Sequence, residues 1–82
     1  MKVTIPGYTS LTGNPEVILQ AMQDARIFDH LTGDEFIAGV THTAWRLFGV
    51  ALQVTGDTYQ ERCESLLREM NRENMIIIEE EN

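Results

Sequence analysis

The sequence has little cysteine and few basic residues, and both shortages exclude classes of protein. Its single cysteine, Cys63, rules out an intramolecular disulfide and a metal site built from several thiolates. Only 6 Lys and Arg residues oppose 13 Asp and Glu residues, so the formal net charge is −7. Binding to nucleic acid or to an anionic membrane needs clustered basic side chains. We therefore expect no direct nucleic-acid or membrane contact, and a surface that suits a basic partner.

Long apolar runs are also missing. No stretch approaches the roughly 18–20 apolar residues that cross a bilayer. The opening residues MKVTIPGY lack the ~7–15-residue apolar segment of a signal peptide. These absences predict a cytoplasmic protein. Hydrophobic residues still make up 43% of the 82 residues, which is enough for one modest core, so we expect a single domain over residues 1–82.

Motifs that hold cofactors and metals are absent as well. Neither GxGxxG nor GxxxxGK[ST] occurs, so no phosphate-binding loop is indicated. His30, His42 and Cys63 are too far apart in sequence for the close ligand spacing of a zinc site. The sequence therefore predicts no cofactor, no metal and no catalytic residue.

One short pattern does recur: an apolar residue, then Thr-Gly, then Asn or Asp. A calcium loop would need acidic oxygens at alternating positions and a closing Glu, and none of the three copies has them. Each copy is instead followed by apolar residues at helical spacing, and Thr, Asn and Asp are residues that begin helices. We therefore predict helices over residues 15–28, 33–48 and 58–72.

The predicted helix ends have specific caps. Asn14 is a strong N-cap residue for the first helix. Thr32 and Glu35 have capping-box spacing at the second helix, with Asp34 as the alternative cap. Asp57 or Thr58 begins the third helix, the latter with Glu61 three residues on. Gly49 is a plausible C-cap of the second helix.

Three further segments have the β-branched and apolar composition of strands: KVTI at the N-terminus, VALQV at residues 50–54 and MIIIE at residues 75–79. Together with the helices they predict an α+β fold. In this fold, three helices pack on a two- or three-stranded sheet formed by the N-terminal, central (50–54) and C-terminal strands.

Each predicted helix carries a core stripe, and those of the second and third helices bear on the candidate residues. On the third helix, Cys63 lies among apolar residues, so we expect a buried thiol that behaves as a small hydrophobe. On the second helix the core stripe is predicted to consist of Phe36, Ile37, Val40, Ala44, Leu47 and Phe48.

The remaining face of the second helix is the candidate contact surface. Trp45 lies ~120° from the centre of the core stripe, while Gly39, His42 and Arg46 lie on the polar arc. A glycine inside a helix costs about 1 kcal/mol relative to alanine, and the close approach of another chain is one reason to keep it. Trp and Arg are residue types that dominate interface energetics. The alternative is that Trp45 only covers another part of its own chain.

Acidic residues gather near the junction of the first two helices. Asp29, Asp34 and Glu35 are the members that we assign to a second contact surface, which would suit a basic partner. From both surfaces we predict a small acidic, non-enzymatic protein-binding or regulatory domain that acts through a protein partner or as a homodimer.

Two alternatives stay open. In composition alone, the chain resembles anti-CRISPR and DNA-mimic inhibitors, and this resemblance implies an acidic mimic of nucleic acid that docks into a basic groove. The other alternative is a small enzyme that uses His42 as a general base, which would need a pocket, a nucleophile and an orienting carboxylate beside it.

Overall fold

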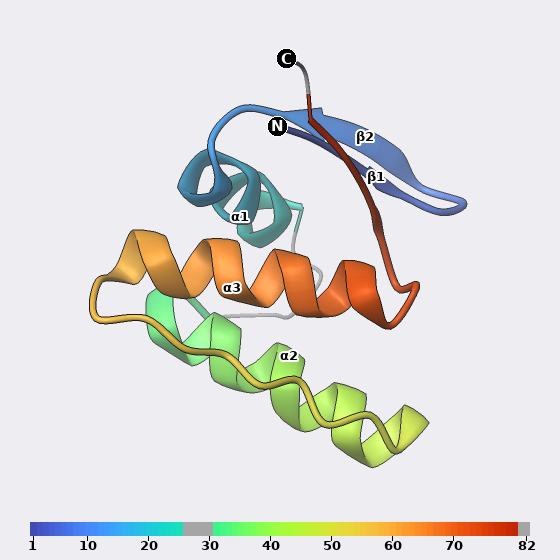
Figure 1. Ribbon diagram of the computed structural model, residues 1–82, viewed down its shortest axis with the longest axis vertical. Coiled ribbons are helices and arrows are strands. Elements are labelled where there is room, and N and C mark those ends of the chain that lie inside the picture. Colours follow the sequence, from blue (N-terminus) through green and yellow to red (C-terminus); the bar gives the residue numbers. More distant parts are fainter. Residues whose placement is uncertain (26–30, 81–82) are drawn as a thin grey trace.

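The computed structural model describes residues 1–25 and 31–80 of the chain. It confirms the α+β class: three helices accompany a three-stranded antiparallel sheet with the strand order β2–β1–β3 (Figure 1). In chain order the elements are β1 (Lys2–Ile5), β2 (Thr9–Thr12), α1 (Pro15–Asp24), α2 (Gly33–Phe48), α3 (Tyr59–Arg72) and β3 (Ile77–Glu79).

The first two strands form a hairpin closed by a tight turn. Tyr8 N–H donates to Ile5 O at 3.0 Å across this turn, and Gly7 has a φ of 76°. Proline at the second position and a positive-φ glycine at the third are typical of a type II turn. The return strand β2 was not predicted, because its sequence Thr-Ser-Leu-Thr has only one apolar residue and is largely exposed.

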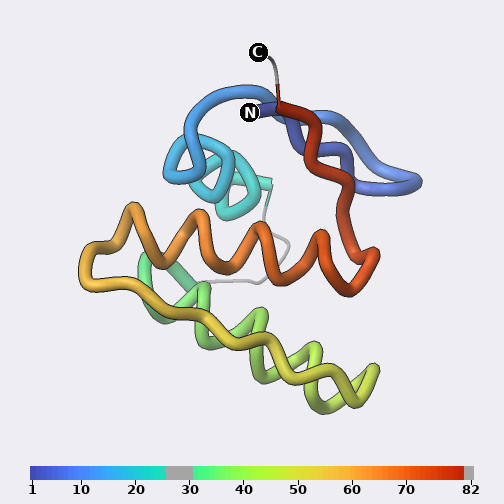
Figure 2. The backbone as a smooth tube through the Cα atoms, viewed as in Figure 1, coloured from blue at the N-terminus to red at the C-terminus, as the bar shows by residue number. Residues whose placement is uncertain are grey.

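The predicted central strand at residues 50–54 is wrong. The segment belongs to no strand and returns from the end of α2 to the start of α3 (Figure 2). Two N–H groups of residues 50–56 donate to side chains of α3: that of Gln53 to Glu69 Oε1 at 2.8 Å, and that of Thr55 to Ser65 Oγ at 2.9 Å. Alternate residues still turn inward as in a strand, but helix side chains replace the neighbouring strand as hydrogen-bond partners.

Helix α3 is the middle layer of the fold. Figure 1 shows α1 and the sheet on one side of it and α2 on the other. This placement buries the α3 stripe formed by Cys63, Leu66, Leu67 and Met70. The same core contains Val3, Ile18, Leu19, Met22, Phe36, Ile37, Val40, Ala44, Leu52 and Ile76.

The predicted helix starts are confirmed, although one cap differs. Asn14 accepts a hydrogen bond from Val17 N–H at 2.9 Å, and Thr58 accepts one from Glu61 N–H at 3.1 Å. Thr32 has the extended conformation of an N-cap residue, but its side chain makes no cap hydrogen bond. The Thr-Gly-Asx pattern therefore marks helix starts, while the predicted capping box of α2 does not form.

The helix ends agree less well with the sequence. Gly49 ends α2 as predicted, in a left-handed conformation, and Val50 N–H donates to Ala44 O at 3.2 Å. Helix α1 ends at Asp24 with Ala25 as its C-cap, and residues 26–28 of its predicted range lie outside the described residues. Across residues 1–25 and 31–80, no helix is long and apolar enough to cross a membrane.

One buried polar side chain connects all three helices. Gln23 of α1 donates from Nε2 to the hydroxyl of Tyr59 in α3 at 3.2 Å, and its Oε1 accepts a longer hydrogen bond of 3.4 Å from Gly33 N–H of α2. Both ends of the buried amide therefore have partners, as buried polar groups require. The sequence did not reveal this contact, because it joins residues distant in the chain.

The burial of Cys63 leads to a testable prediction. Its side chain is buried as expected, and this burial raises the pKa of the thiol. A thiol reagent should therefore react slowly with native protein and rapidly in denaturant, because the thiolate is the reacting form and is neither exposed nor favoured in the fold. Equal rates in the two conditions would show that Cys63 is accessible.

A second prediction concerns the C-terminal strand. Chain truncation after Asn74 removes β3 and Ile76, and burying even one Ile side chain contributes roughly 1.5–3 kcal/mol. We expect this truncation to remove most of the free energy of unfolding, which for a domain is only ~5–15 kcal/mol, as measured by urea denaturation.

Two neighbouring isoleucines provide the matched control for this prediction. Ile76 is 2% exposed and Ile77 is 51% exposed. We expect Ile76→Ala to cost ~2–5 kcal/mol of unfolding free energy and Ile77→Ala far less. Equal losses from the two substitutions, or an unchanged melting temperature after truncation, would contradict the assigned packing of this segment.

Candidate functional site

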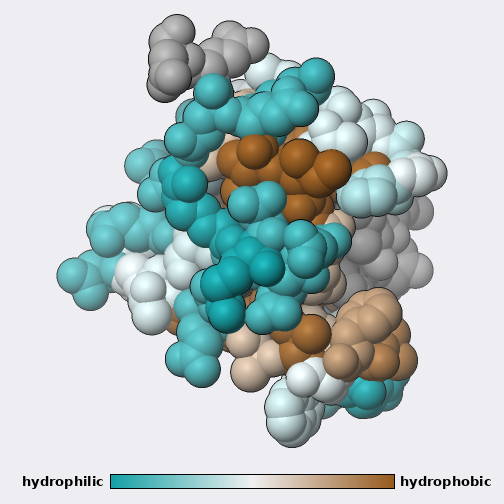
Figure 3. All heavy atoms as spheres, turned by 45° about the vertical axis from the view of Figure 1, so that its right-hand side comes forward, coloured by the Kyte–Doolittle hydropathy of each residue, from teal (hydrophilic) through white to brown (hydrophobic). Residues whose placement is uncertain are grey.

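The last turn of α2 carries the most prominent exposed apolar group. Trp45 is 63% exposed, Leu47 62% and Phe48 66%. We call these three residues the α2 apolar cluster. Figure 3 shows apolar side chains at the surface in the lower part of the molecule, where α2 ends. The exposure of Trp45 agrees with its predicted position away from the core stripe.

The exposure of Leu47 and Phe48 corrects the prediction that both belong to the core. They do continue the stripe of buried residues on α2, but this burial stops at Ala44. Figure 1 shows the reason: the axes of α2 and α3 diverge toward their C-terminal ends. The core-facing side of α2 therefore continues past the point where the rest of the chain covers it.

An apolar groove opens where these two helices diverge. Its inner part has a volume of about 150 Å³ and is lined by Met22, Phe36, Val40, Thr43, Ala44, Phe48, Met70 and Met75. A shallower part of about 400 Å³ continues past Phe48, Val50, Glu73, Asn74 and Met75. Phe48 and Met75 line both parts, so the groove runs beside the α2 apolar cluster. Its methionines are flexible side chains that adapt to different contacts.

The polar arc of α2 is placed as predicted, with one difference. His42, Arg46 and Glu35 are all exposed. Gly39 is partly covered, and a Cβ added to it would lie 2.5 Å from Cδ1 of Leu31. The space beside Gly39 is thus filled by Leu31 of the same chain. This contact accounts for a glycine inside the helix, and no partner chain is needed to explain it. We therefore leave Gly39 out of the candidate surface.

Arg46 differs from the other described basic residues. The ion pairs elsewhere join Lys2 to Glu79, Arg62 to Asp34, Arg68 to Glu64 and Glu80, and Arg72 to Glu69 and Glu73. Arg46 makes no ion pair with any residue in the described ranges, and the same is true of Glu35. Within the described residues, the exposed side of α2 therefore presents one unpaired charge of each sign.

The predicted acidic surface is only partly present. Asp34 is held by Arg62, which donates from Nε to Oδ1 at 2.8 Å and from Nη2 to Oδ2 at 3.1 Å. The guanidinium keeps the pKa of the Asp34 carboxyl below its usual value. This contact links α2 to α3, so Asp34 already has a partner within the fold. Asp29, together with His30, lies outside the described residues.

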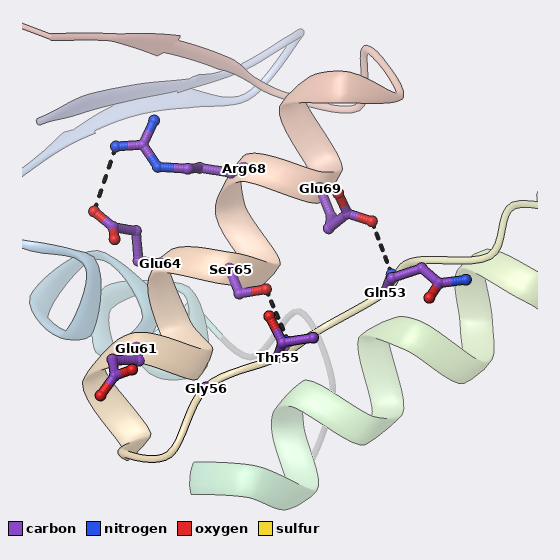
Figure 4. A pocket seen from close by; sticks show the side chains of 8 residues that line it. All are labelled: Gln53, Thr55, Gly56, Glu61, Glu64, Ser65, Arg68 and Glu69. Carbon is purple, nitrogen blue, oxygen red and sulfur yellow. Dashed lines mark hydrogen bonds and ion pairs between the residues drawn. The ribbon is translucent and has the colours of Figure 1, made fainter.

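A polar cavity of about 400 Å³ lies on the other side of α3 (Figure 4). Its lining residues are Gln53, Thr55, Gly56, Glu61, Glu64, Ser65, Arg68 and Glu69. Figure 4 shows that several of them contact one another, through the Gln53–Glu69, Thr55–Ser65 and Arg68–Glu64 interactions. These groups hold residues 50–56 against α3, and His42 does not line the cavity.

Two further findings concern metal binding and similarity to known proteins. Among residues 1–25 and 31–80, no three His, Cys, Asp or Glu side chains gather where they could hold a metal ion. Comparisons with protein-family models, with curated proteins and with solved structures found no match. The candidate site is therefore defined by this chain alone: the α2 apolar cluster, the adjoining groove, and the exposed Glu35, His42 and Arg46.

Proposed function

We propose that the protein is a small, non-enzymatic protein-binding domain whose contact surface is the exposed side of α2. The observation that carries the proposal is the α2 apolar cluster, in which three large apolar side chains are more than half exposed within four residues and beside an apolar groove. Trp45 and Phe48 are neighbours on the helix at i, i+3, and exposed apolar side chains that lie together among polar residues are typical of protein contact sites. Burying these side chains against a partner would remove apolar surface from water that folding leaves exposed, and this removal would favour association.

The charge distribution supports this choice of surface. Residues 36–56 contain a single formal charge, that of Arg46, while all 13 acidic residues lie elsewhere in the chain. The cores of protein interfaces are depleted in charged residues, because removing a charge from water is costly. A partner can therefore cover this surface without burying a carboxylate, whereas the rest of the molecule is strongly acidic.

The two alternative functions have weaker support. A nucleic-acid mimic needs carboxylates that are free to face a basic groove, yet Asp34, Glu64, Glu69, Glu73, Glu79 and Glu80 each contact a basic residue of the same chain. Catalysis through His42 needs a pocket and a nucleophile. His42 lies instead on an exposed helix face, outside both the groove and the polar cavity.

Site-specific photo-crosslinking tests whether α2 is the contact surface. A photoreactive phenylalanine analogue would replace Trp45 in one variant and Tyr8 in the control, because both side chains are 63% exposed but Tyr8 lies in the β1–β2 turn. In an extract of the source cells, we expect a protein adduct from position 45 and not from position 8. The mass of the adduct identifies what binds. Equal adducts from both positions, or none from position 45, would contradict the proposal.

Substitution then measures the contribution of the same side chain to affinity. We expect Trp45→Ala to weaken binding of the crosslinked protein by more than ~1 kcal/mol, while Tyr8→Ala has little effect and neither changes the melting temperature appreciably. Added salt should weaken an apolar contact only slightly, whereas docking of an acidic mimic into a basic groove is strongly salt-sensitive. Steep salt dependence with no effect of Trp45→Ala would favour the acidic alternative.

A further inference from the structure

We infer that the occupant of this surface is a second copy of the same chain, packed antiparallel along α2 so that Arg46 of each copy meets Glu35 of the other. The inference rests on the proposed function and names the partner for the part of this surface that Trp45, Arg46 and Glu35 form. Three features of α2 carry it: the positions of its unpaired charges, the sizes of the side chains between them, and its place in the charge distribution of the whole chain.

The unpaired charges make α2 complementary to itself in one direction. Glu35 and Arg46 are eleven residues apart, or about 16 Å along the helix axis. At ~100° per residue they lie only about 20° apart around the helix. A two-fold axis perpendicular to two antiparallel helices places the start of one helix beside the end of the other, with the same flank meeting the same flank. Both copies of Arg46 then face a Glu35.

A parallel arrangement has the opposite consequence. It would bring each residue level with its own copy, so Arg46 would lie level with Arg46 and Glu35 with Glu35, and no pair of opposite charges would meet across the interface. The antiparallel arrangement also aligns the two helix dipoles favourably. Exposed ion pairs contribute little free energy, so we assign to these two pairs the direction of packing rather than the strength of binding.

The side chains between the two charges fit this direction. Ala38 and Trp45 are seven residues apart and therefore lie on one line along α2, beside the line of Glu35 and Arg46. When Arg46 is level with Glu35 of the second copy, Trp45 lies only about 3 Å along the axis from the Ala38 of that copy. The largest side chain of the surface thus meets one of the smallest. Thr41, which lies between them, already donates its hydroxyl hydrogen to Ala38 O at 2.9 Å.

The net charge of −7 also favours α2 as the place where two copies meet. Two acidic molecules repel each other, and the repulsion is smallest when their acidic parts are farthest apart. Residues 36–56 hold no acidic residue. Contact through α2 therefore keeps Asp57, the acidic residues of α3, Glu79 and Glu80 away from the centre of the interface.

The size of the surface sets the expected strength. Helix α2 has 16 residues and is about 24 Å long. A pair of such helices buries less than the ~800 Å² per partner of a standard stable interface. We therefore expect a weak dimer whose population rises with concentration, with Trp45 supplying much of the affinity.

Sedimentation equilibrium with charge-reversal variants tests this arrangement. The purified wild-type chain should pass from monomer toward dimer over a hundredfold range of concentration. Glu35→Arg and Arg46→Glu should each raise the dissociation constant by roughly five- to tenfold, because each reversal creates two like-charge contacts in the dimer. An equimolar mixture of the two variants should recover dimer formation, since each pair in the mixed dimer joins opposite charges. Melting temperatures of both variants check that α2 is intact.

The outcomes of this experiment separate the packing direction, the identity of the occupant and the proposed function. Recovery in the mixture supports antiparallel packing, whereas two weakened variants that do not recover when mixed would overturn it. A wild-type chain that stays monomeric throughout would overturn the second copy as occupant. In that case an adduct of position 45 with a different protein in the extract would leave the proposed function standing. Absence of both self-association and any adduct would remove both proposals.

Discussion

The burial of α3 is the constraint on which the rest of the structure depends. Its apolar stripe is covered by α1 and the sheet on one side and by α2 on the other, while Ser65 and Glu69 hold residues 50–56. Among residues 1–25 and 31–80, no further helix or strand remains to cover α2 once these layers are in place. The outer side of α2 therefore stays uncovered, and the divergence of α2 from α3 exposes the last turn of α2 as well.

The ion pairs also distinguish the covered helix α3 from the outer side of α2. Arg62 links α3 to Asp34 at the start of α2, and Arg68 links α3 to Glu80 after β3. These contacts use basic side chains to connect elements, and they lower the number of acids that are free to bind a basic partner. Arg46 takes no part in them. It remains available on the outer side of α2, where the proposed contact surface lies.

Local features of the fold could be predicted from the sequence, because their causes are local. Asn14 and Thr58 begin helices through bonds to residues three positions on, and Gly49 ends one through its own conformation. The strand at Thr9–Thr12 could not be recognised in the same way, because its identity depends on pairing with β1 rather than on apolar alternation. Residues 50–54 have the composition of a strand, but they lie beside α3, whose Glu69 accepts a hydrogen bond from Gln53 N–H.

The candidate site was likewise predictable only where its features depend on spacing within one helix. The exposure of Trp45 followed from its angle on the helix, which sequence spacing alone determines. The exposure of Phe48 and the groove beside it did not, because both depend on the angle between α2 and α3. The contact of Arg62 with Asp34 and the filling of the space at Gly39 by Leu31 likewise join residues that the sequence leaves unrelated.

Fluorescence of the single tryptophan tests the central claim most directly, since Trp45 is the only tryptophan in the chain and lies within the proposed contact surface. In dilute, monomeric protein its emission should be that of an indole exposed to water. When the protein associates, as checked by its mass, the emission should shift to shorter wavelength because the indole leaves water. Emission of a buried indole in the dilute monomer, or an unchanged emission in the associated protein, would contradict the claim that the exposed side of α2 is the contact surface.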